Sequence, residues 1–496
     1  MDLKTKTVKG VGWVGLSQII QLVVAMVIFI ILTRLLTPSD FGLIAEIVVF
    51  TNFAALFSNL GLTYAIIQRK EVSKTVLSST FWVNLGLGVV LTVGLITLSP
   101  LIAAFYGQPM LVPLITVLSF SFVISSLSSI QSTLFSKELR FKILALVSII
   151  SLVSSGAIAI VLAFSGYGVW ALVWYSLGTS LITTALLCVF SEWRPSFAFS
   201  WSEERAIMKY GLNLTGYNFA NYFARNLDDL LIGRFLGPAA VGFYDRAYQI
   251  MLFPLSNVSS VIGQVAFPAL SIIQDDKKQV REAYIQATRL IAVVTFPLAV
   301  GMLILAPQFV IAVFGAQWVP AILLIQLLSL AAIIQSVVTT VGWIYMSQGR
   351  TDIMFRIGIL ASVGAVIAFI VGIKLGGLTG LTASYVVATY LIGYLNLFFA
   401  FKIIDLSFSY FVRRFRSVII TSFLAGVITL ATRFSLEQLA VTNSLFVLIS
   451  ASIIGFVAYI TFLRTLDKQL ITEVAELIRI MLSTEKTTDE KPFDDA

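Results

Sequence analysis

Three residue types are scarce in this 496-residue chain, and each scarcity excludes a class of chemistry. There is no histidine, so the commonest proton shuttle and metal ligand is missing. The single cysteine, Cys188, rules out an intrachain disulfide and any metal site built from thiolates. Charged residues make up 12% of the chain, whereas about 25% is usual in soluble proteins. We therefore expect no metal site and no ordinary soluble domain.

Sequence motifs of enzymes and ATPases are missing as well. No G-x-x-x-x-G-K-[ST] phosphate loop occurs, so we expect no ATP site. The chain has no G-x-S-x-G motif and no large extramembrane segment on which a catalytic site would be built. These absences predict a protein that is not an enzyme and that uses no cofactor.

Long apolar runs are what the chain has in abundance. Hydrophobic residues make up 58% of it, and its mean hydropathy is +0.96. The runs are continuous, as in membrane helices, and do not alternate in polarity like the strands of a membrane barrel. The first run, residues 11–36, is too long for the apolar part of a cleavable signal peptide, so we expect a retained span. The sequence predicts an all-α polytopic membrane protein.

Taking about 20 apolar residues as one span, the chain contains fourteen predicted transmembrane helices. Their ranges are 11–36, 42–67, 75–98, 110–135, 143–164, 169–190, 211–236, 242–270, 289–314, 320–346, 353–374, 378–401, 417–434 and 443–463. An even number places both termini on one side of the membrane. If that side is the cytoplasm, every Lys and Arg lies in an inside segment except Arg34, Arg225, Arg234, Arg246, Lys374 and Arg433. The positive-inside rule thus predicts cytoplasmic termini and explains the net charge of +8 without a nucleic-acid partner.

The chain also repeats itself. An apolar-x-Arg-x-Leu-x-Pro-x-x-x-Gly motif occurs twice, 200 positions apart, with its Arg, Pro and Gly at Arg34, Pro38 and Gly42 and at Arg234, Pro238 and Gly242. Two further anchors match at offsets of 207 and 212, namely Leu98-Ser-Pro100 with Leu305-Ala-Pro307 and Gly168-Val-Trp-Ala171 with Gly380-Leu-Thr-Ala383. Six helices per half give both halves the same orientation, and transporters made of such parallel repeats place their site between the halves.

This repeat predicts the organisation of the chain. We expect an N-terminal lobe of helices 1–6 (residues 1–190), a cytoplasmic linker (191–210), a pseudo-symmetric lobe of helices 7–12 (211–402), helices 13 and 14 (403–464), and an amphipathic segment with an acidic tail (465–496). The polar run 277–282 has the character of a second linker. Pro38 and Pro238 are expected to mark turns or helix starts, and the glycine pairs Gly166/Gly168 and Gly376/Gly377 to form tight turns.

One predicted helix, 211–236, carries charges where a lipid-spanning helix should have none. Each Arg or Asp at the bilayer centre costs about 2.5–3.5 kcal/mol on insertion scales. Arg225 faces Asp228 and Asp229 at helical spacing, so pairing within the helix would offset part of this cost. The cluster is either the wall of a hydrophilic cavity or a self-neutralised structural lock. In the first case Asp228 and Asp229 would set the charge of the cavity or carry a coupling ion or proton.

A polar stripe on the same helix favours the cavity interpretation. Asn218, Asn221, Arg225 and Asp229 recur at helical spacing on one face, with Tyr222 beside them. Amides, charges and aromatic rings suit sugar hydroxyls and an anionic head group. We expect Arg225 to bind the anion, and Asn218, Asn221 and Tyr222 to contact sugar.

Charged residues near the repeated motif have two interpretations each. Arg34 and Arg234, near the outer ends of the first and seventh helices, would either snorkel to the membrane interface or hold a diphosphate between their guanidinium groups. Glu46 and the Asp245–Arg246 pair lie at matching places early in the second helix of each half. They would form either gating pairs between the lobes or ion pairs that anchor loops.

Three stretches carry a family resemblance: LTRLLTPSDFGLIA at 32–45, NLDDLLIGRFLGPAAVGFYDRAYQI at 226–250 and QVAFPALS at 264–271. Over nearly its whole length the chain resembles the polysaccharide exporters of the O-antigen, colanic-acid and teichuronic-acid branch. That branch belongs to the multidrug/oligosaccharidyl-lipid/polysaccharide exporter superfamily. The resemblance implies fourteen spans in a 6 + 6 + 2 plan. It also implies a flippase of the bacterial inner membrane that moves polyprenyl-diphosphate-linked oligosaccharides for surface polysaccharides such as lipopolysaccharide.

The resemblance leaves the driving force and two other functions open. Coupling would be to a proton, a sodium ion or the membrane potential, and other polysaccharide-assembly proteins are further expected partners. A drug exporter of the same fold is the alternative, although that branch generally has twelve helices. A glycan polymerase or ligase would need long outside loops, whereas the predicted outside connections are a few residues long. The lipid tail of the substrate is expected to stay in the bilayer, along helices 13 and 14.

Overall fold

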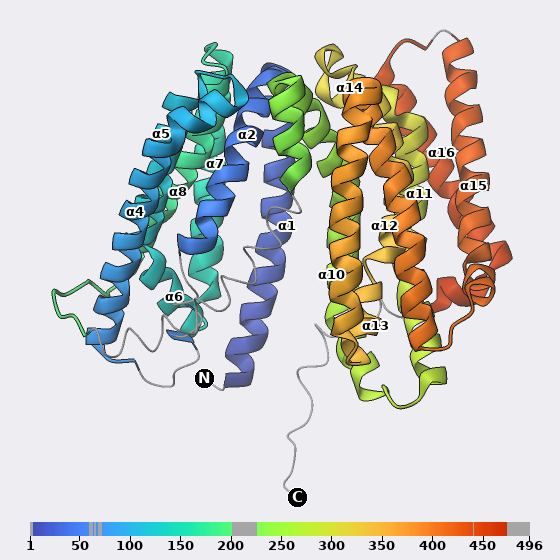
Figure 1. Ribbon diagram of the computed structural model, residues 1–496, viewed down its shortest axis with the longest axis horizontal. Coiled ribbons are helices and arrows are strands. Elements are labelled where there is room, and N and C mark those ends of the chain that lie inside the picture. Colours follow the sequence, from blue (N-terminus) through green and yellow to red (C-terminus); the bar gives the residue numbers. More distant parts are fainter. Residues whose placement is uncertain are drawn as a thin grey trace, which may run out of the picture. The chain divides into compact units, whose positions relative to one another are not determined.

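The computed structural model describes residues 3–58, 63, 66–67, 72–200, 226–439 and 441–473 (Figure 1). Within these ranges every regular element is a helix. The chain divides into two compact units, Met1–Asp245 and Arg246–Ala496. Four of the predicted site residues lie outside the described residues, namely Asn218, Asn221, Tyr222 and Arg225.

The first unit is a bundle of long helices around an apolar core. Its elements are α1 (Leu3–Leu35), α2 (Pro38–Ser58), α4 (Lys74–Tyr106), α5 (Leu111–Ser126), α6 (Ser129–Lys137), α7 (Phe141–Phe164), α8 (Val169–Phe190), a helical segment over residues 226–236 and the beginning of α10 (Pro238–Ile272). Helix α4 packs along α5, and α7 packs against both α8 and α1 (Figure 1). Small residues allow close approach, because Gly156 of α7 lies directly against the side chain of Ile28.

The second unit is organised around α11. Its elements are the remainder of α10, α11 (Lys277–Phe309), a π turn (Val310–Phe314), a 3₁₀ turn (Ala316–Trp318), α12 (Ala321–Val338), α13 (Val341–Ser347), α14 (Thr351–Ile403), α15 (Phe408–Gln438) and α16 (Ser444–Leu466). Helix α11 packs against α12, α15 and α16, and α15 also packs along α16 (Figure 1).

One largely buried acid holds the end of the second unit together. Asp467, just after α16, accepts hydrogen bonds from the Arg289 guanidinium of α11 and from the Ser417 hydroxyl of α15, the latter at 2.6 Å. Its other carboxylate oxygen accepts from the backbone N–H of Leu470 at 3.1 Å, which starts the next helical turns. Leu470 is 1% exposed, so the beginning of the predicted amphipathic segment is docked on the unit.

The helices have the lengths that membrane spans require. Eleven helices in the described ranges are long and apolar enough to cross a bilayer, and the bent pair α5–α6 brings the number to twelve. The chain is therefore a multi-pass helical membrane protein. Helix α14 contains non-helical dihedral angles at Gly376 and Gly377, where the sequence predicted a turn between two spans. The predicted span 211–236 is described from residue 226 on, so the total of fourteen stays a prediction.

Two local predictions are corrected by the structure. The predicted helix 110–135 bends by 43° between α5 and α6, where Ser126 and Ser128 bond back to carbonyl groups of the preceding turn. The polar run 277–282, predicted to be linker-like, forms the first turns of α11. Asp276 caps this helix by accepting hydrogen bonds from the backbone N–H groups of Lys278 and Gln279 at 2.9 and 3.1 Å.

Candidate functional site

The two copies of the repeated motif meet in the first unit. Helix α2 begins at Pro38 and α10 begins at Pro238, as the sequence predicted. A Cβ atom on Gly42 would lie 1.6 Å from the carbonyl oxygen of Pro238. A Cβ atom on Gly242 would lie 1.9 Å from the carbonyl oxygen of Pro38. The contact is therefore reciprocal, backbone against backbone, and both positions require glycine.

The two helix starts use different chemistry to reach the same geometry. Thr37 and Asp40 cap α2 mutually, with the Thr37 N–H donating to the Asp40 carboxylate at 2.8 Å and the Asp40 N–H donating to the Thr37 hydroxyl at 3.3 Å. Gly237 precedes α10 with a φ of +82°, a left-handed conformation that glycine adopts without strain. The two copies of the motif thus make the same backbone contact, although the starts of α2 and α10 are capped differently.

A buried acid lies one helical turn beyond this contact. Glu46 of α2 is fully buried, and within the described part of the chain neither carboxylate oxygen has a hydrogen-bond partner. The helical segment 226–236 covers it. A Cβ atom on Gly233 would lie 3.0 Å from a Glu46 carboxylate oxygen and 2.5 Å from the ring of Tyr106. The gating role predicted for Glu46 with Asp245 and Arg246, which are half-buried in α10, stays a prediction.

The predicted charge cluster is described in part. Asp228 is 8% exposed and accepts a hydrogen bond from the Tyr244 hydroxyl of α10 at 3.2 Å. This bond ties the segment 226–236 to the helix that follows it. Asp229 is half-buried on the neighbouring face. The expected pairing of both acids with Arg225 falls on a residue outside the described ranges.

Both predicted outer arginines are exposed. Arg34 ends α1, and the Arg234 guanidinium lies over the ring of Phe105, 5.8 Å from its centroid. This stacking holds a cation against an aromatic face at the end of α4. That Arg34 and Arg234 bind a diphosphate between their guanidinium groups stays a prediction.

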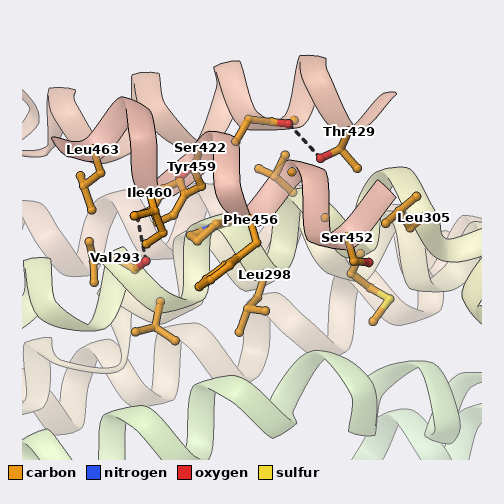
Figure 2. A pocket seen from close by; sticks show the side chains of 18 of the residues that line it. Val293, Leu298, Leu305, Ser422, Thr429, Ser452, Phe456, Tyr459, Ile460 and Leu463 are labelled. Atoms are coloured by element: carbon orange, nitrogen blue, oxygen red, sulfur yellow. Dashed lines mark hydrogen bonds between the residues drawn. The ribbon is translucent and has the colours of Figure 1, made fainter. Parts of the chain in front are cut away.

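The described part of the structure contains two apolar grooves that were not predicted from the sequence. In the second unit a cavity of about 740 Å³ lies between α11, α15 and α16 (Figure 2). Leu298 of α11 and Phe456 of α16 both point into it, while Thr429 of α15 and Ser452 of α16 are among its few polar side chains (Figure 2). The Tyr459 hydroxyl donates to the Val293 carbonyl at 2.8 Å, a bond between two lining residues that joins α16 to α11 (Figure 2).

The other groove, in the first unit, has a volume of about 670 Å³ and lies between α2 and α4. Its residues are Val49, Phe50, Phe53, Ala54 and Phe57 of α2, Val90, Leu91, Gly94, Leu95, Leu98, Leu101, Ile102 and Phe105 of α4, and Leu230 of the segment 226–236. A sequence signal for both grooves existed in the match of Leu98-Ser-Pro100 with Leu305-Ala-Pro307, which places α4 and α11 in equivalent positions of the repeat.

Comparisons with known proteins agree on one family. The family described as "Polysaccharide biosynthesis protein" matches residues 31–323. The chain is 30% identical over 388 residues to the lipopolysaccharide biosynthesis protein WzxC of Escherichia coli, covering 78% of this chain and 79% of that protein. It is 28% identical to the teichuronic acid biosynthesis protein TuaB of Bacillus subtilis, covering 91% and 94% of the two chains. The resemblance predicted from the repeated motif is confirmed.

Solved structures show the same fold. The lipid II flippase MurJ, in an inward closed conformation, superimposes with a TM-score of 0.72 at 15% identity, over 92% of this chain and 99% of its own. An inward-facing multidrug resistance transporter of the MOP superfamily superimposes with a TM-score of 0.62 at 15% identity, over 78% and 94% of the two chains. At this identity the likeness concerns the fold alone, and it confirms the predicted class of polytopic helical membrane protein.

Proposed function

The chain belongs to the polysaccharide biosynthesis protein family, and from this membership we propose that it is a flippase for lipid-linked oligosaccharides. It moves a polyprenyl-diphosphate-linked oligosaccharide across the bacterial inner membrane for the synthesis of a surface polysaccharide. The observation that carries the proposal is the match along most of the chain to proteins named for lipopolysaccharide and teichuronic acid biosynthesis. A fold like that of a lipid II flippase supports it.

The transport cycle follows from the internal repeat. We propose fourteen spans with cytoplasmic termini, a lobe at 1–190, a linker at 191–210, a second lobe at 211–402, helices 13 and 14 at 403–464 and a cytoplasmic tail at 465–496. The two repeats rock so that the substrate is exposed first to the cytoplasm and then to the outside. The reciprocal contacts of Gly42 with Pro238 and of Gly242 with Pro38 support a pseudo-twofold relation between the two repeats, which this cycle requires.

Different charged and polar residues bind different parts of the substrate. Arg225, with Arg34 and Arg234, binds the diphosphate, for which guanidinium groups offer paired hydrogen bonds. The amides and ring of Asn218, Asn221 and Tyr222 contact sugar. Asp228 and Asp229 set the charge around the head group or carry the coupling ion, and the burial of Asp228 with Tyr244 supports such a role.

The lipid tail has a place in the second unit. The groove between α11, α15 and α16 is lined almost entirely by apolar side chains, and α15 and α16 are the helices along which the sequence predicted the tail. Arg464 lines the same groove near the end of α16. An apolar groove with a cation at one end fits a long hydrocarbon chain that ends in phosphate.

The sidedness of the lipid-linked oligosaccharide tests the proposal. In vesicles from a strain that lacks the gene, the oligosaccharide is expected on the cytoplasmic face, protected from or exposed to an impermeant glycosidase according to vesicle orientation. Expression of the chain should restore outward exposure. Normal exposure without the gene would overturn the proposal and favour a drug exporter of the same fold.

The same assay distinguishes the possible driving forces for transport. We propose coupling to a proton, a sodium ion or the membrane potential, with no ATP used by the chain itself. A potassium–valinomycin clamp removes the membrane potential, a sodium ionophore removes the sodium gradient, and a protonophore removes the proton gradient together with the potential. Comparison of the three treatments identifies the coupling. Restored flipping that survives all three treatments would contradict secondary coupling.

A further inference from the structure

The two apolar grooves are formed by equivalent faces of the two repeats. At the offset of 207 that aligns Pro100 with Pro307, six groove positions of α4 coincide with six groove positions of α11. These pairs are Val90 with Pro297, Leu91 with Leu298, Gly94 with Gly301, Leu95 with Met302, Leu98 with Leu305, and Ile102 with Phe309. The duplication therefore produced equivalent apolar faces on α4 and α11, and each face lines a groove.

A glycine opens each groove at the same place. Gly94 and Gly301 are equivalent in the repeat, both line their groove, and a Cβ atom on either would meet no heavy atom within 4 Å. In an apolar helix, glycine costs about 0.5–1 kcal/mol relative to alanine. Gly94 and Gly301 therefore leave the two grooves open at equivalent positions of the repeat.

The walls of the two grooves differ. In the second unit α15 and α16 form the opposite wall, whereas in the first unit α2 and Leu230 take that place. Along α4 the groove extends from Val90 to Phe105, about 22 Å at 1.5 Å per residue. Half of the hydrocarbon core measures about 15 Å. The groove is thus longer than one leaflet and fits a chain longer than a phospholipid acyl chain.

A positively charged side chain lies at one end of the first groove. Phe105 lines this end, and the Arg234 guanidinium lies over its ring. Arg234 is exposed, so its guanidinium can receive an anion while the hydrocarbon attached to that anion lies along α4. The groove and the arginine together match one molecule, a long hydrocarbon chain that ends in a phosphate.

We propose that the groove between α2 and α4 binds the polyprenyl chain of the lipid-linked substrate, with the diphosphate on Arg234. The first unit then holds a second tail site, in which α4 takes the place that α11 has in the groove between α11, α15 and α16. This inference rests on the proposed flippase function and adds to it the place of the tail in the N-terminal repeat.

Photocrosslinking tests the site. The full chain is reconstituted into nanodiscs of phosphatidylethanolamine and phosphatidylglycerol with a polyprenyl diphosphate that carries a diazirine in its chain. After irradiation, labelled peptides are mapped by mass spectrometry. We expect labels on α4 between Val90 and Phe105 and on the facing residues of α2. An excess of unlabelled polyprenyl diphosphate should remove them.

Three glycine variants provide the matched comparison. Gly94→Leu fills the first groove and should lower its labelling by about tenfold while leaving labels on α11 unchanged. Gly301→Leu should do the reverse. Gly86→Leu is the control, because Gly86 is on α4 in open space but outside the groove, and its labelling should equal that of the unchanged chain. In the Arg234→Gln variant, unlabelled polyprenyl diphosphate should compete less well with the photoreactive probe. In the Arg234→Lys variant, part of this competition should return.

Several results would overturn the proposal. Labels found on α11, α15 and α16 alone would exclude tail binding in the groove between α2 and α4. They would leave the proposed flippase function unaffected. Equal competition by phosphatidic acid, which the nanodiscs do not otherwise contain, would show an ordinary lipid contact. No displaceable label in either unit, together with normal oligosaccharide sidedness in the deletion strain, would remove the proposed function as well.

Discussion

Two acids, the fully buried Glu46 in the first unit and the largely buried Asp467 in the second, are held in opposite ways. Asp467 accepts hydrogen bonds from Arg289, Ser417 and the Leu470 backbone. Glu46 is more deeply buried, and no described residue donates to its carboxylate. A buried acid with a full set of partners fixes an arrangement, whereas one without partners costs free energy. The comparison teaches that several described donors fix the end of α16 through Asp467, whereas no described donor fixes the Glu46 carboxylate.

The close contact next to Glu46 should be the most sensitive to change. Gly42→Ala places a methyl group on the Pro238 carbonyl, so we expect more than about 3 kcal/mol of destabilisation, seen as loss of folded protein in size-exclusion chromatography. Gly94→Ala, in open space, should be neutral or stabilising by about 0.5–1 kcal/mol. Equal stability of the two variants would show that the contact is not maintained in the membrane.

Asp467→Asn should have the next largest effect. The change leaves the largely buried Arg289 guanidinium without its counter-charge, and breaking such a pair costs about 3 kcal/mol. A lower melting temperature of the purified chain checks this. Combination with Arg289→Gln should recover part of the loss, and a strictly additive double variant would contradict a direct pairing.

Glu46→Gln should separate stability from function. Because no described group bonds the buried carboxylate, the neutral amide should leave the stability unchanged or raise it. Flipping in vesicles should nevertheless fall by about tenfold, since ionisable groups inside a membrane mark ion or substrate paths. A loss of stability as large as that of Asp467→Asn would instead give Glu46 a structural role.

Lys277→Gln should have the smallest effect. Its ion pair with Asp405 measures 2.9 Å, but the two side chains are 50% and 61% exposed. Exposed pairs contribute about 0.2–1 kcal/mol and are screened by salt. The melting temperature should barely move at physiological ionic strength. A change similar to that of Asp467→Asn would mean that this pair is shielded in the membrane-bound protein.

Much of the fold could be predicted from hydropathy and glycine–proline chemistry. The helices α2 and α10 start at Pro38 and Pro238, and the dihedral break in α14 falls at Gly376 and Gly377. These features depend on residues that act within one turn of themselves. The bend between α5 and α6 was missed because serine hydroxyls return to the backbone, and apolar content alone does not record that.

The candidate site was predictable in its charges but not in its geometry. The pattern of the chain singled out Glu46, Asp228 and Arg234 because they are charged residues in apolar helices. Their surroundings depend on segments far away in sequence, such as Tyr106 and Gly233 beside Glu46, or Phe105 beneath Arg234. Spacing along one helix contains no information about these neighbours.

The sequence by itself determined the class of protein, the helix starts and the duplication, because each follows from local apolar length, backbone restriction or the comparison of the chain with itself. Only the tertiary structure decided that the duplicated glycines meet the opposite proline carbonyls, that no described residue bonds the buried Glu46 carboxylate, and that α4 and α11 line equivalent grooves. The physical reason is that a close contact or a groove exists between elements, so it arises when helices pack and has no signature within any one of them.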